Sequence, residues 1–305
     1  MSAMPILQRR GLVGALLRLG FLSLVLLAAA GLFFGQGPVS VPLLDEVWAC
    51  PMDPDVRGHT PGTCPRCGMK LVSGIPEPVE YSMDLQMRPT APKPFQPALL
   101  TFFISDPWKG RPVLNFNIVH EKPFHLFAVS QDMKVFVHDH PVLERDGRFT
   151  YQIAFPQAGM YRLLGDFYPD GATPQLIAKT IMVPGRAPDP ARLQRDYSTK
   201  MAENLEVELV TEPPVPIAHA KTLMFFKVRP GGGLEKLLGA WGHMLAASDD
   251  LIDMIHTHPF LADGSPQIQF NMIFPRATTY RVWVQFKRQG VVNTAHFDLP
   301  VEDIH

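Results

Sequence analysis

The residues best suited to chemistry in this chain gather in one stretch, from Trp48 to Val72, which holds all three cysteines. The side chains there that offer sulfur or imidazole nitrogen are Cys50, Cys64, Cys67, Met52, Met69 and His59. Thiolates, thioethers and imidazoles are the ligands that soft and borderline metal ions select. Cys64 and Cys67 form a C-x-x-C knuckle, which aims two sulfurs at one point, and Gly68 permits the tight turn that follows. The stretch therefore predicts a metal site in which Cys50 supplies a third thiolate.

A histidine triple that occurs twice is the second set of candidate ligands. In each copy, a histidine is followed thirteen residues later by an H-x-H-P motif. The members are His125, His138 and His140 in the first copy and His243, His256 and His258 in the second. Residues i and i+2 of a strand face the same way, so each H-x-H presents two imidazoles to one side, and the third joins them if its strand lies alongside. Three imidazoles suit Cu(II), zinc or nickel. The alternative is that these histidines cap strand ends and bind no metal.

Two segments of the cysteine-rich stretch, CPMDP at 50–54 and PGTCPRCGMKL at 61–71, match the motifs of a known family. The stretch resembles the short heavy-metal-binding domain found next to copper-transporting P-type ATPases and in periplasmic adaptors of metal efflux pumps. That family reads roughly CPMHP and then PGxCPxCGMxL, so Asp53 departs from it where histidine is usual. The resemblance implies a metal site built from the three cysteines, with Met52 and Met69 as further ligands.

A disulfide between the two knuckle cysteines, Cys64 and Cys67, is the alternative for this stretch. It leaves Cys50 unexplained, because an exported protein with an odd number of cysteines retains one thiol, whereas a three-thiolate site accounts for all of them. The candidates for a fourth ligand are His59, Met52, Met69 and Asp53.

The N-terminus predicts a membrane anchor over residues 1–38. Basic residues precede an apolar run from Leu19 to Phe34, and the segment is long enough to cross a bilayer. The charges place the N-terminus inside, so we expect a single-pass plasma-membrane protein with most of its chain in the periplasm or outside the cell. A cleaved signal peptide is the alternative, since Ala28–Gly31 supplies small residues for cleavage. The net charge of −1 gives no reason to expect a nucleic-acid partner.

The remainder of the chain is an internal duplication of strand-like segments. LTFFISD at 100–106 aligns with LMFFKVR at 223–229, and the histidine triples align as well. Such short runs of β-branched and aromatic residues, cut by proline and glycine, predict a mainly β protein with two tandem immunoglobulin-like antiparallel β-sandwiches. Leu234–Trp241 is the one segment after the anchor expected to form a helical turn. The predicted parts are the anchor at 1–38, a metal-binding module at 46–75, repeats at 79–184 and 203–305, and a linker at 185–202.

These features favour a membrane-anchored protein that captures or hands over a heavy-metal ion, copper or zinc, without catalysis. The expected partner is a metal efflux protein or an oxidase under assembly. One alternative is an interaction scaffold with a structural zinc in the module. Another is a cupin-like metalloenzyme that uses His138, His140 and Glu144, although the second copy has Ala262 at the position of Glu144.

Overall fold

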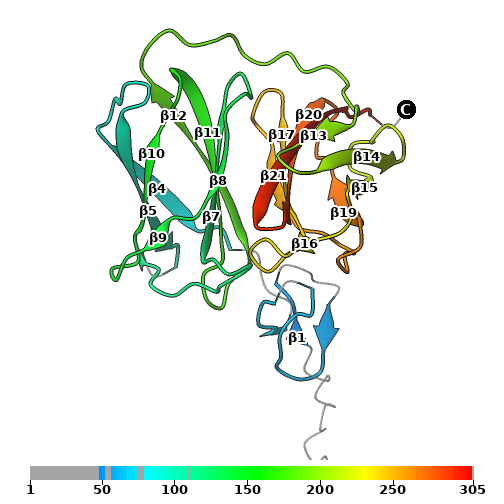
Figure 1. Ribbon diagram of the computed structural model, residues 1–305. Helices are drawn as coiled ribbons and strands as arrows, with labels where there is room; N and C mark the ends of the chain where they lie inside the picture. Colours follow the sequence, from blue (N-terminus) through cyan, green and yellow to red (C-terminus); the bar gives the residue numbers. More distant parts are fainter. Residues whose placement is uncertain (1–47, 52–55, 67, 75–78, 109, 304–305) are drawn as a thin grey trace, which may run out of the picture. The chain divides into compact units, whose positions relative to one another are not determined.

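The structure, a computed structural model, describes residues 48–303 except 52–55, 67, 75–78 and 109, and the regular elements among them are all β-strands. Paired strands in every sheet run antiparallel (Figure 1). The prediction of a mainly β protein is therefore confirmed. Within the described residues, no helix is long and apolar enough to cross a membrane. The predicted anchor over residues 1–38 lies outside the described part of the chain.

The cysteine-rich module is built on a small three-stranded sheet in the order β2-β1-β3. Its strands are β1 (Trp48–Ala49), β2 (Arg57–Gly58) and β3 (Val72–Ser73). Strands of two residues bury little surface by themselves, so the module depends on its turns and on its few buried side chains.

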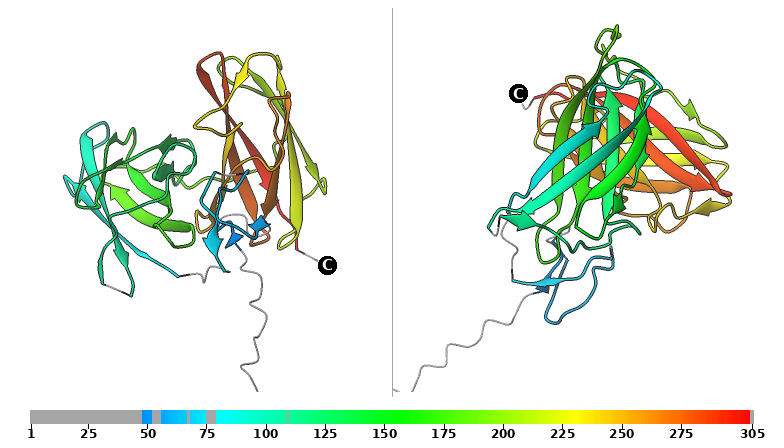
Figure 2. Two further views of the ribbon diagram at one scale, coloured as in Figure 1. Left: turned by 90° about the horizontal axis from the view of Figure 1, so that it is seen from below. Right: turned by 90° about the vertical axis from the view of Figure 1, so that its left-hand side faces the viewer.

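The first repeat packs two sheets face to face, as the views in Figure 2 show. One sheet has the order β4-β5-β10-β9, with β6 paired to β5, and the other has the order β12-β11-β7-β8. The strands of the first sheet are β4 (Ser82–Arg88), β5 (Pro97–Asp106), β6 (Arg111–Pro112), β9 (Val142–Leu143) and β10 (Phe149–Ala154). Those of the second are β7 (Phe124–Ser130), β8 (Phe136–Asp139), β11 (Gly159–Phe167) and β12 (Gln175–Val183).

The second repeat has the same two-sheet plan. One sheet has the order β13-β14-β15-β19 and the other β16-β20-β17-β18, with β21 paired to β20. The first contains β13 (Lys200–Met201), β14 (Glu206–Glu212), β15 (Lys221–Arg229) and β19 (Gln267–Ile273). The second contains β16 (Leu234–Glu235), β17 (His243–Ser248), β18 (Met254–Thr257), β20 (Thr279–Arg288) and β21 (Val291–Pro300).

Strands β7 and β17 are buried at every residue, and this sets them apart from the alternating strands of the other sheets. Successive side chains of a strand point to opposite faces, so both faces of β7 and β17 must be covered. Alternate residues of β7 enter the core of the first repeat, namely Phe124, Leu126 and Ala128. Phe127 and Val129, which point to the other face, join Leu245 and Ala247 of β17 in a cluster that both repeats share.

This inter-repeat cluster joins the two sandwiches through apolar side chains. Its buried members are Phe127, Val129, Met133, Leu164, Leu245, Ala247, Leu251, Met254 and Trp283. At its edge Phe136 of the first repeat stacks on Trp283 of the second, with ring centroids 5.0 Å apart and planes 8° apart. Arg281 adds a hydrogen bond from Nη1 to the carbonyl of Met133, at 3.1 Å. The repeats therefore dock on each other, which brings the outer faces of β7 and β17 together.

The helical turn expected over Leu234–Trp241 is wrong. The segment forms the short strand β16 and then a tight turn, in which the amides of Leu237 and Ala240 each donate to the other's carbonyl, at 2.7 and 3.0 Å. Leu238 and Gly239, between them, both have positive φ, which suits a two-residue hairpin turn and is incompatible with a right-handed helix.

Replacement of Trp283 by alanine is expected to lower the free energy of unfolding by about 3–5 kcal/mol, because a buried indole is removed from the inter-repeat cluster. Trp108 gives a matched control, since it is 82% exposed whereas Trp283 is 4% exposed. Trp108→Ala should change the stability by no more than about 0.5 kcal/mol. Urea unfolding followed by far-UV circular dichroism measures both, and equal effects would contradict the proposed role of the cluster.

Candidate metal centre

The module places two of its predicted sulfur ligands and one thioether in a common buried cluster. Cys50, Cys64 and Met69 pack there with Val119 and Tyr168 of the first repeat. The knuckle turn is closed by the amide of Gly68, which donates to the carbonyl of Cys64 at 2.8 Å. His59 lies exposed on the module, while Met52, Asp53 and Cys67 fall outside the described residues.

The first histidine set, His125, His138 and His140, converges at one end of β7 and β8. These strands pair with Phe127 opposite His138, so His125 on β7 and the H-x-H motif beside it present their imidazoles to the same side. Nδ1 of His125 lies 3.3 Å from Nε2 of His138 and 3.2 Å from Nε2 of His140. His125 is thus close to both members of H-x-H, while the three ligand atoms here that all lie within 4.8 Å of one another belong to His125, His138 and His243 of the second repeat.

Hydrogen bonds on the outward nitrogens fix which way two of these rings face. Nε2 of His125 contacts the carbonyl oxygen of Val119 at 3.0 Å, and Nδ1 of His138 contacts Oε1 of Gln285 at 2.7 Å. Both partner atoms are oxygens that can only accept a hydrogen bond, so each outward nitrogen must carry the proton and donate it. The inward nitrogens then carry lone pairs that point at one another, which is the arrangement of neutral imidazoles around a cation.

The second histidine set, His243, His256 and His258, repeats this arrangement on β17 and β18. Nε2 of His243 contacts the carbonyl of Leu237 at 2.9 Å, and its Nδ1 lies 3.1 Å from Nε2 of His258. Among the described residues, Nε2 of His256 is buried and has no hydrogen-bond partner. A buried polar atom without a partner is costly, and a metal ion would satisfy this nitrogen.

Each repeat also supplies a partner for a histidine of the other repeat. Gln285 on β20 of the second repeat binds His138, as described above, and Asp166 on β11 of the first binds Nδ1 of His256 through Oδ2, at 2.5 Å. The two occupy equivalent positions, because Asp166 is opposite His125 in its sheet and Gln285 is opposite His243. The six histidines and these two partners therefore form a centre with approximate two-fold symmetry.

Two matching turns supply the carbonyl groups that orient His125 and His243. In the first, Val119 and Lys122 pair across His120 and Glu121, which both have positive φ. In the second, Leu237 and Ala240 pair in the same way. The turn that was expected to be helical is thus the element that positions His243.

Burial lowers the pKa of all six histidines, because the charged imidazolium is costly to desolvate, and for most of them the neighbouring histidines lower it further. The pKa of His138 and of His140 falls to about 4. Burial also raises the pKa of Asp166 to about 7. The imidazoles are therefore neutral at physiological pH, and neutral imidazole is the form that binds metal.

The spacing of the nitrogens fits a metal ion. Zinc–nitrogen bonds of about 2.0–2.1 Å at tetrahedral angles place two ligand nitrogens roughly 3.3 Å apart. The separations of 3.1–3.3 Å within the sets match this value. Three nitrogens leave a fourth position for water or for a transferred ligand.

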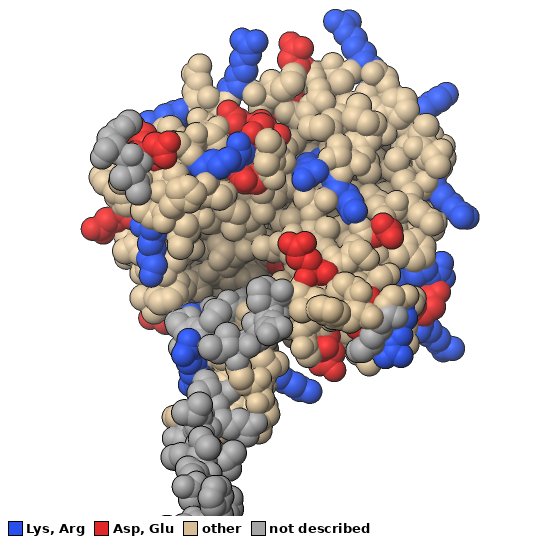
Figure 3. Space-filling model, turned by 180° about the vertical axis from the view of Figure 1, so that it is seen from behind, with Lys and Arg blue, Asp and Glu red and all other residues tan. Residues whose placement is uncertain are grey.

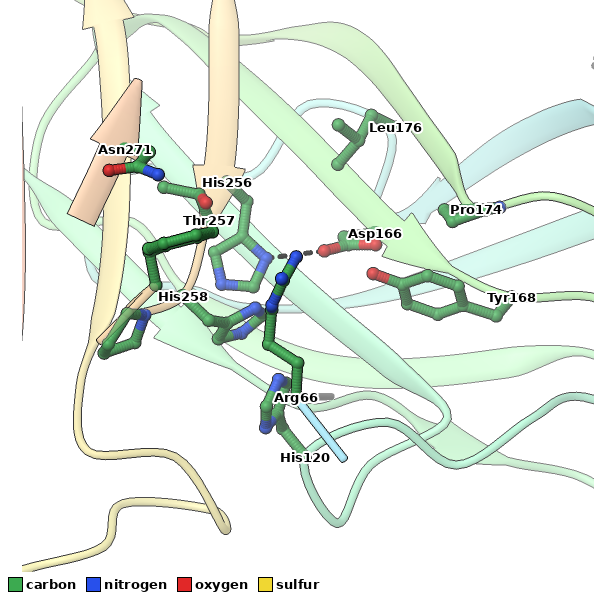
Figure 4. Close-up of a pocket in the computed structure, with 12 residues that line it drawn as sticks. Arg66, His120, Asp166, Tyr168, Pro174, Leu176, His256, Thr257, His258 and Asn271 are labelled. Atoms are coloured by element: carbon green, nitrogen blue, oxygen red, sulfur yellow. Dashed lines mark hydrogen bonds and ion pairs between the residues drawn. The ribbon is translucent and has the colours of Figure 1, made fainter. Parts of the chain in front are cut away.

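A cavity of ≈ 340 Å³ opens beside the second set (Figure 4). His256, His258 and Asp166 line it on the side of the repeats, and Arg66 of the C-x-x-C knuckle lines it on the side of the module. The second set and the C-x-x-C knuckle thus border the same cavity.

On the face drawn in Figure 3, lysine and arginine are interspersed with aspartate and glutamate. Glu144, the third residue of the cupin-like alternative, belongs to neither set. It lies where β9 turns into β10 and accepts a hydrogen bond from Oγ1 of Thr150 at 2.8 Å. The third nitrogen beside His138 and His140 comes from His125 instead.

Comparison with protein families identifies two parts of the chain. Residues 78–183 and 200–303 each match the family described as a domain of unknown function (DUF8832), which together is more than half of the chain. The chain belongs to the DUF8832 family. Residues 47–73 match the heavy metal binding domain, which supports metal binding by the module and agrees with the resemblance noted from the sequence. A comparison with curated proteins finds no match.

Solved structures resemble the DUF8832 repeats only distantly. The adhesin InvE of Yersinia pseudotuberculosis is 10% identical, with a TM-score of 0.25, and the match covers 72% of this chain and 60% of InvE. A two-domain fibronectin type III segment of chicken tenascin is 10% identical, with a TM-score of 0.20, and the match covers 72% of this chain and 99% of the segment. The chain thus spans less than two thirds of InvE, and at these TM-scores no functional conclusion follows.

Sequence reasoning located both histidine sets but missed the residues that orient them. Asp166 and Gln285 are far from their histidine partners in the sequence and belong to the opposite repeat. A signal was present in β7 and β17, whose segments HLFAVS and HMLAAS are apolar without alternation, as strands covered on both faces are.

In the metal-free protein, the free energy of unfolding is expected to fall as the pH is lowered from 7 to 5. Unfolded histidines take up protons below about pH 6.5, whereas His138 stays neutral in the folded protein down to about pH 4. Each histidine that stays neutral in this way adds about 1.4 kcal/mol per pH unit to the slope of the free energy of unfolding against pH. Asp166 has the opposite effect on stability, because its raised pKa lets the folded protein bind a proton that the unfolded chain has released. It therefore cancels the contribution of about one histidine.

Urea unfolding in excess EDTA, repeated between pH 7 and pH 5, measures how steeply the free energy of unfolding depends on pH. His138→Gln should reduce this dependence, whereas His219→Asn, at an exposed histidine outside both sets, should not. Stability that does not change between pH 7 and pH 5 would contradict neutral, buried histidines.

Proposed function

We propose that this protein captures a heavy-metal ion, copper or zinc, outside the plasma membrane and hands it to a partner protein. The observation that carries the proposal is the convergence of imidazole nitrogens, 3.1–3.3 Å apart. Carbonyl and side-chain groups hold the outward nitrogens of four of the rings, those of His125, His138, His243 and His256. Rings oriented in this way are preorganised to bind a cation.

The chain offers two kinds of donor, and they suit different ions. The cysteines of the module favour soft ions such as Cu(I), and the neutral imidazoles between the repeats favour Cu(II) or zinc. Packing of Cys50, Cys64 and Met69 against Val119 connects the two sites, because the Val119 carbonyl orients His125. We propose that an ion passes between them before it reaches an efflux adaptor or an oxidase under assembly.

The predicted anchor at residues 1–38 would keep this exchange at the membrane surface. The chemistry we propose is binding and transfer without catalysis: the histidines and cysteines bind the ion, and Asp166 and Gln285 hold the rings in place.

Metal content of the purified, reduced full-length chain tests the proposal. We expect copper or zinc in the protein, a lower content in a variant with Cys50, Cys64 and Cys67 replaced by alanine, and a lower content again when the six histidines of both sets are also replaced. Elemental analysis after desalting measures all three, and His219→Asn serves as the control. A wild-type chain that retains no metal after incubation with either ion would contradict the proposal.

A structural zinc in the module is the second candidate, and the burial of Cys50 and Cys64 in an apolar cluster favours it. A structural ion stabilises the fold that it completes. If the module holds one, EDTA should lower the temperature at which the wild-type module unfolds, and should leave the triple cysteine variant unchanged. For a transfer site we expect little change with EDTA and rapid exchange of bound zinc for added Cd²⁺. Differential scanning calorimetry and elemental analysis of the Cd²⁺-treated protein distinguish the two.

A further inference from the structure

We infer that the centre between the repeats holds two metal ions, one in each histidine set, and that the set oriented by Asp166 binds its ion more tightly. The inference rests on the proposed function, since it concerns the same histidines.

The second set is complete within its own repeat, and two of the three nitrogen separations of the first set are also short. His125, His138 and His140 approach through Nδ1 of the first and Nε2 of the other two, at 3.3 and 3.2 Å. In the second set, Nδ1 of His243 faces Nε2 of His258 at 3.1 Å, and the ligand atoms of all three members lie within 4.8 Å of one another. The first set is gathered less closely, since His125 lies near both His138 and His140 but its compact group is completed by His243. We infer that an ion in the first set draws His140 in as its third ligand.

The two sets adjoin at the approximate two-fold axis. The rings of His125 and His243 lie 5.8 Å apart between centroids, and those of His138 and His243 lie 5.2 Å apart. Ligand atoms of His125, His138 and His243 also fall within 4.8 Å of one another. A single ion shared by these three residues is therefore the competing arrangement, in which His140 and His258 have no part.

The contacts of His140 and His258 favour two ions over one. In each set the closest inward approach is made by the last histidine of H-x-H-P, which faces the first-strand histidine at 3.2 Å in one repeat and 3.1 Å in the other. A shared ion would leave both of these nitrogens beside a ligand without binding it. Either a hydrogen bond from one nitrogen to the other or an ion beside both accounts for this approach, and only an ion in each set lets all six imidazoles bind metal.

The partners of the two sets differ in chemistry, which makes the sets unequal. His256 is held by the carboxyl group of Asp166, which can give up its proton when a cation binds beside it, and His138 is held by the amide of Gln285, which stays neutral. A carboxylate behind a ligating histidine raises its basicity as a ligand, and loss of such a partner typically costs 10- to 100-fold in metal affinity. The second set, which also adjoins the cavity of Figure 4, should therefore fill first.

Titration with Co²⁺, whose visible absorption reports tetrahedral binding, tests the inference in the full-length chain with Cys50, Cys64 and Cys67 replaced by alanine. We expect two ions per chain in this background and in its His219→Asn derivative. We expect one in the His140→Ala derivative, one in His258→Ala, and none when both are combined. The wild-type chain, titrated in parallel, should bind these two ions in addition to any held by the module, which keeps the test valid if the cysteine variant misfolds.

One ion per chain, retained in both single variants, would overturn the two-ion centre and leave the proposed function standing. No bound ion in the cysteine variant and none in the wild-type chain would overturn both. Asp166→Asn should weaken the tighter site by about 10- to 100-fold, and Gln285→Glu should strengthen the weaker one. If Asp166→Asn leaves both affinities unchanged, the inequality of the two sets is wrong.

Discussion

The burial of β7 and β17 on both faces is the constraint on which the rest of this molecule depends. A strand with no exposed face needs cover on each side, and the two repeats cover each other. The same contact buries His125 and His243, which are 1% exposed and therefore cannot rely on water for hydrogen bonds. Their outward nitrogens are satisfied by backbone carbonyls, and their inward nitrogens are left for one another or for an ion.

Much of the local structure could be predicted from the sequence because it depends on near neighbours. The period of two along a strand places the two imidazoles of each H-x-H on one side, and the equal offset in both copies gives the first histidine the same neighbours. Docking of the repeats could not be predicted in this way, because it depends on surfaces that meet only after each sandwich has formed. The partners Asp166 and Gln285 were hidden for the same reason, and their different side chains concealed their equivalence.

The error at Leu234–Trp241 has a simple physical origin. Leucine, lysine and glutamate in that segment all favour a helix when taken one at a time. Gly239 and the positive φ of Leu238 close a hairpin turn instead, and the carbonyl of Leu237 faces His243. The corresponding turn of the first repeat has His120 and Glu121 at these positions, so that two unlike sequences adopt one backbone shape for one purpose.

The crossed partners also bear on how this chain arose. Residue i of one repeat meets residue j of the other, and j meets i, which is the isologous pattern of a two-fold homodimer. An ancestral single repeat would have completed its centre by pairing with an identical copy. Fusion of the two copies makes assembly independent of protein concentration and allows each half to change alone. The aspartate and glutamine at equivalent positions show that the two halves already differ at their centre.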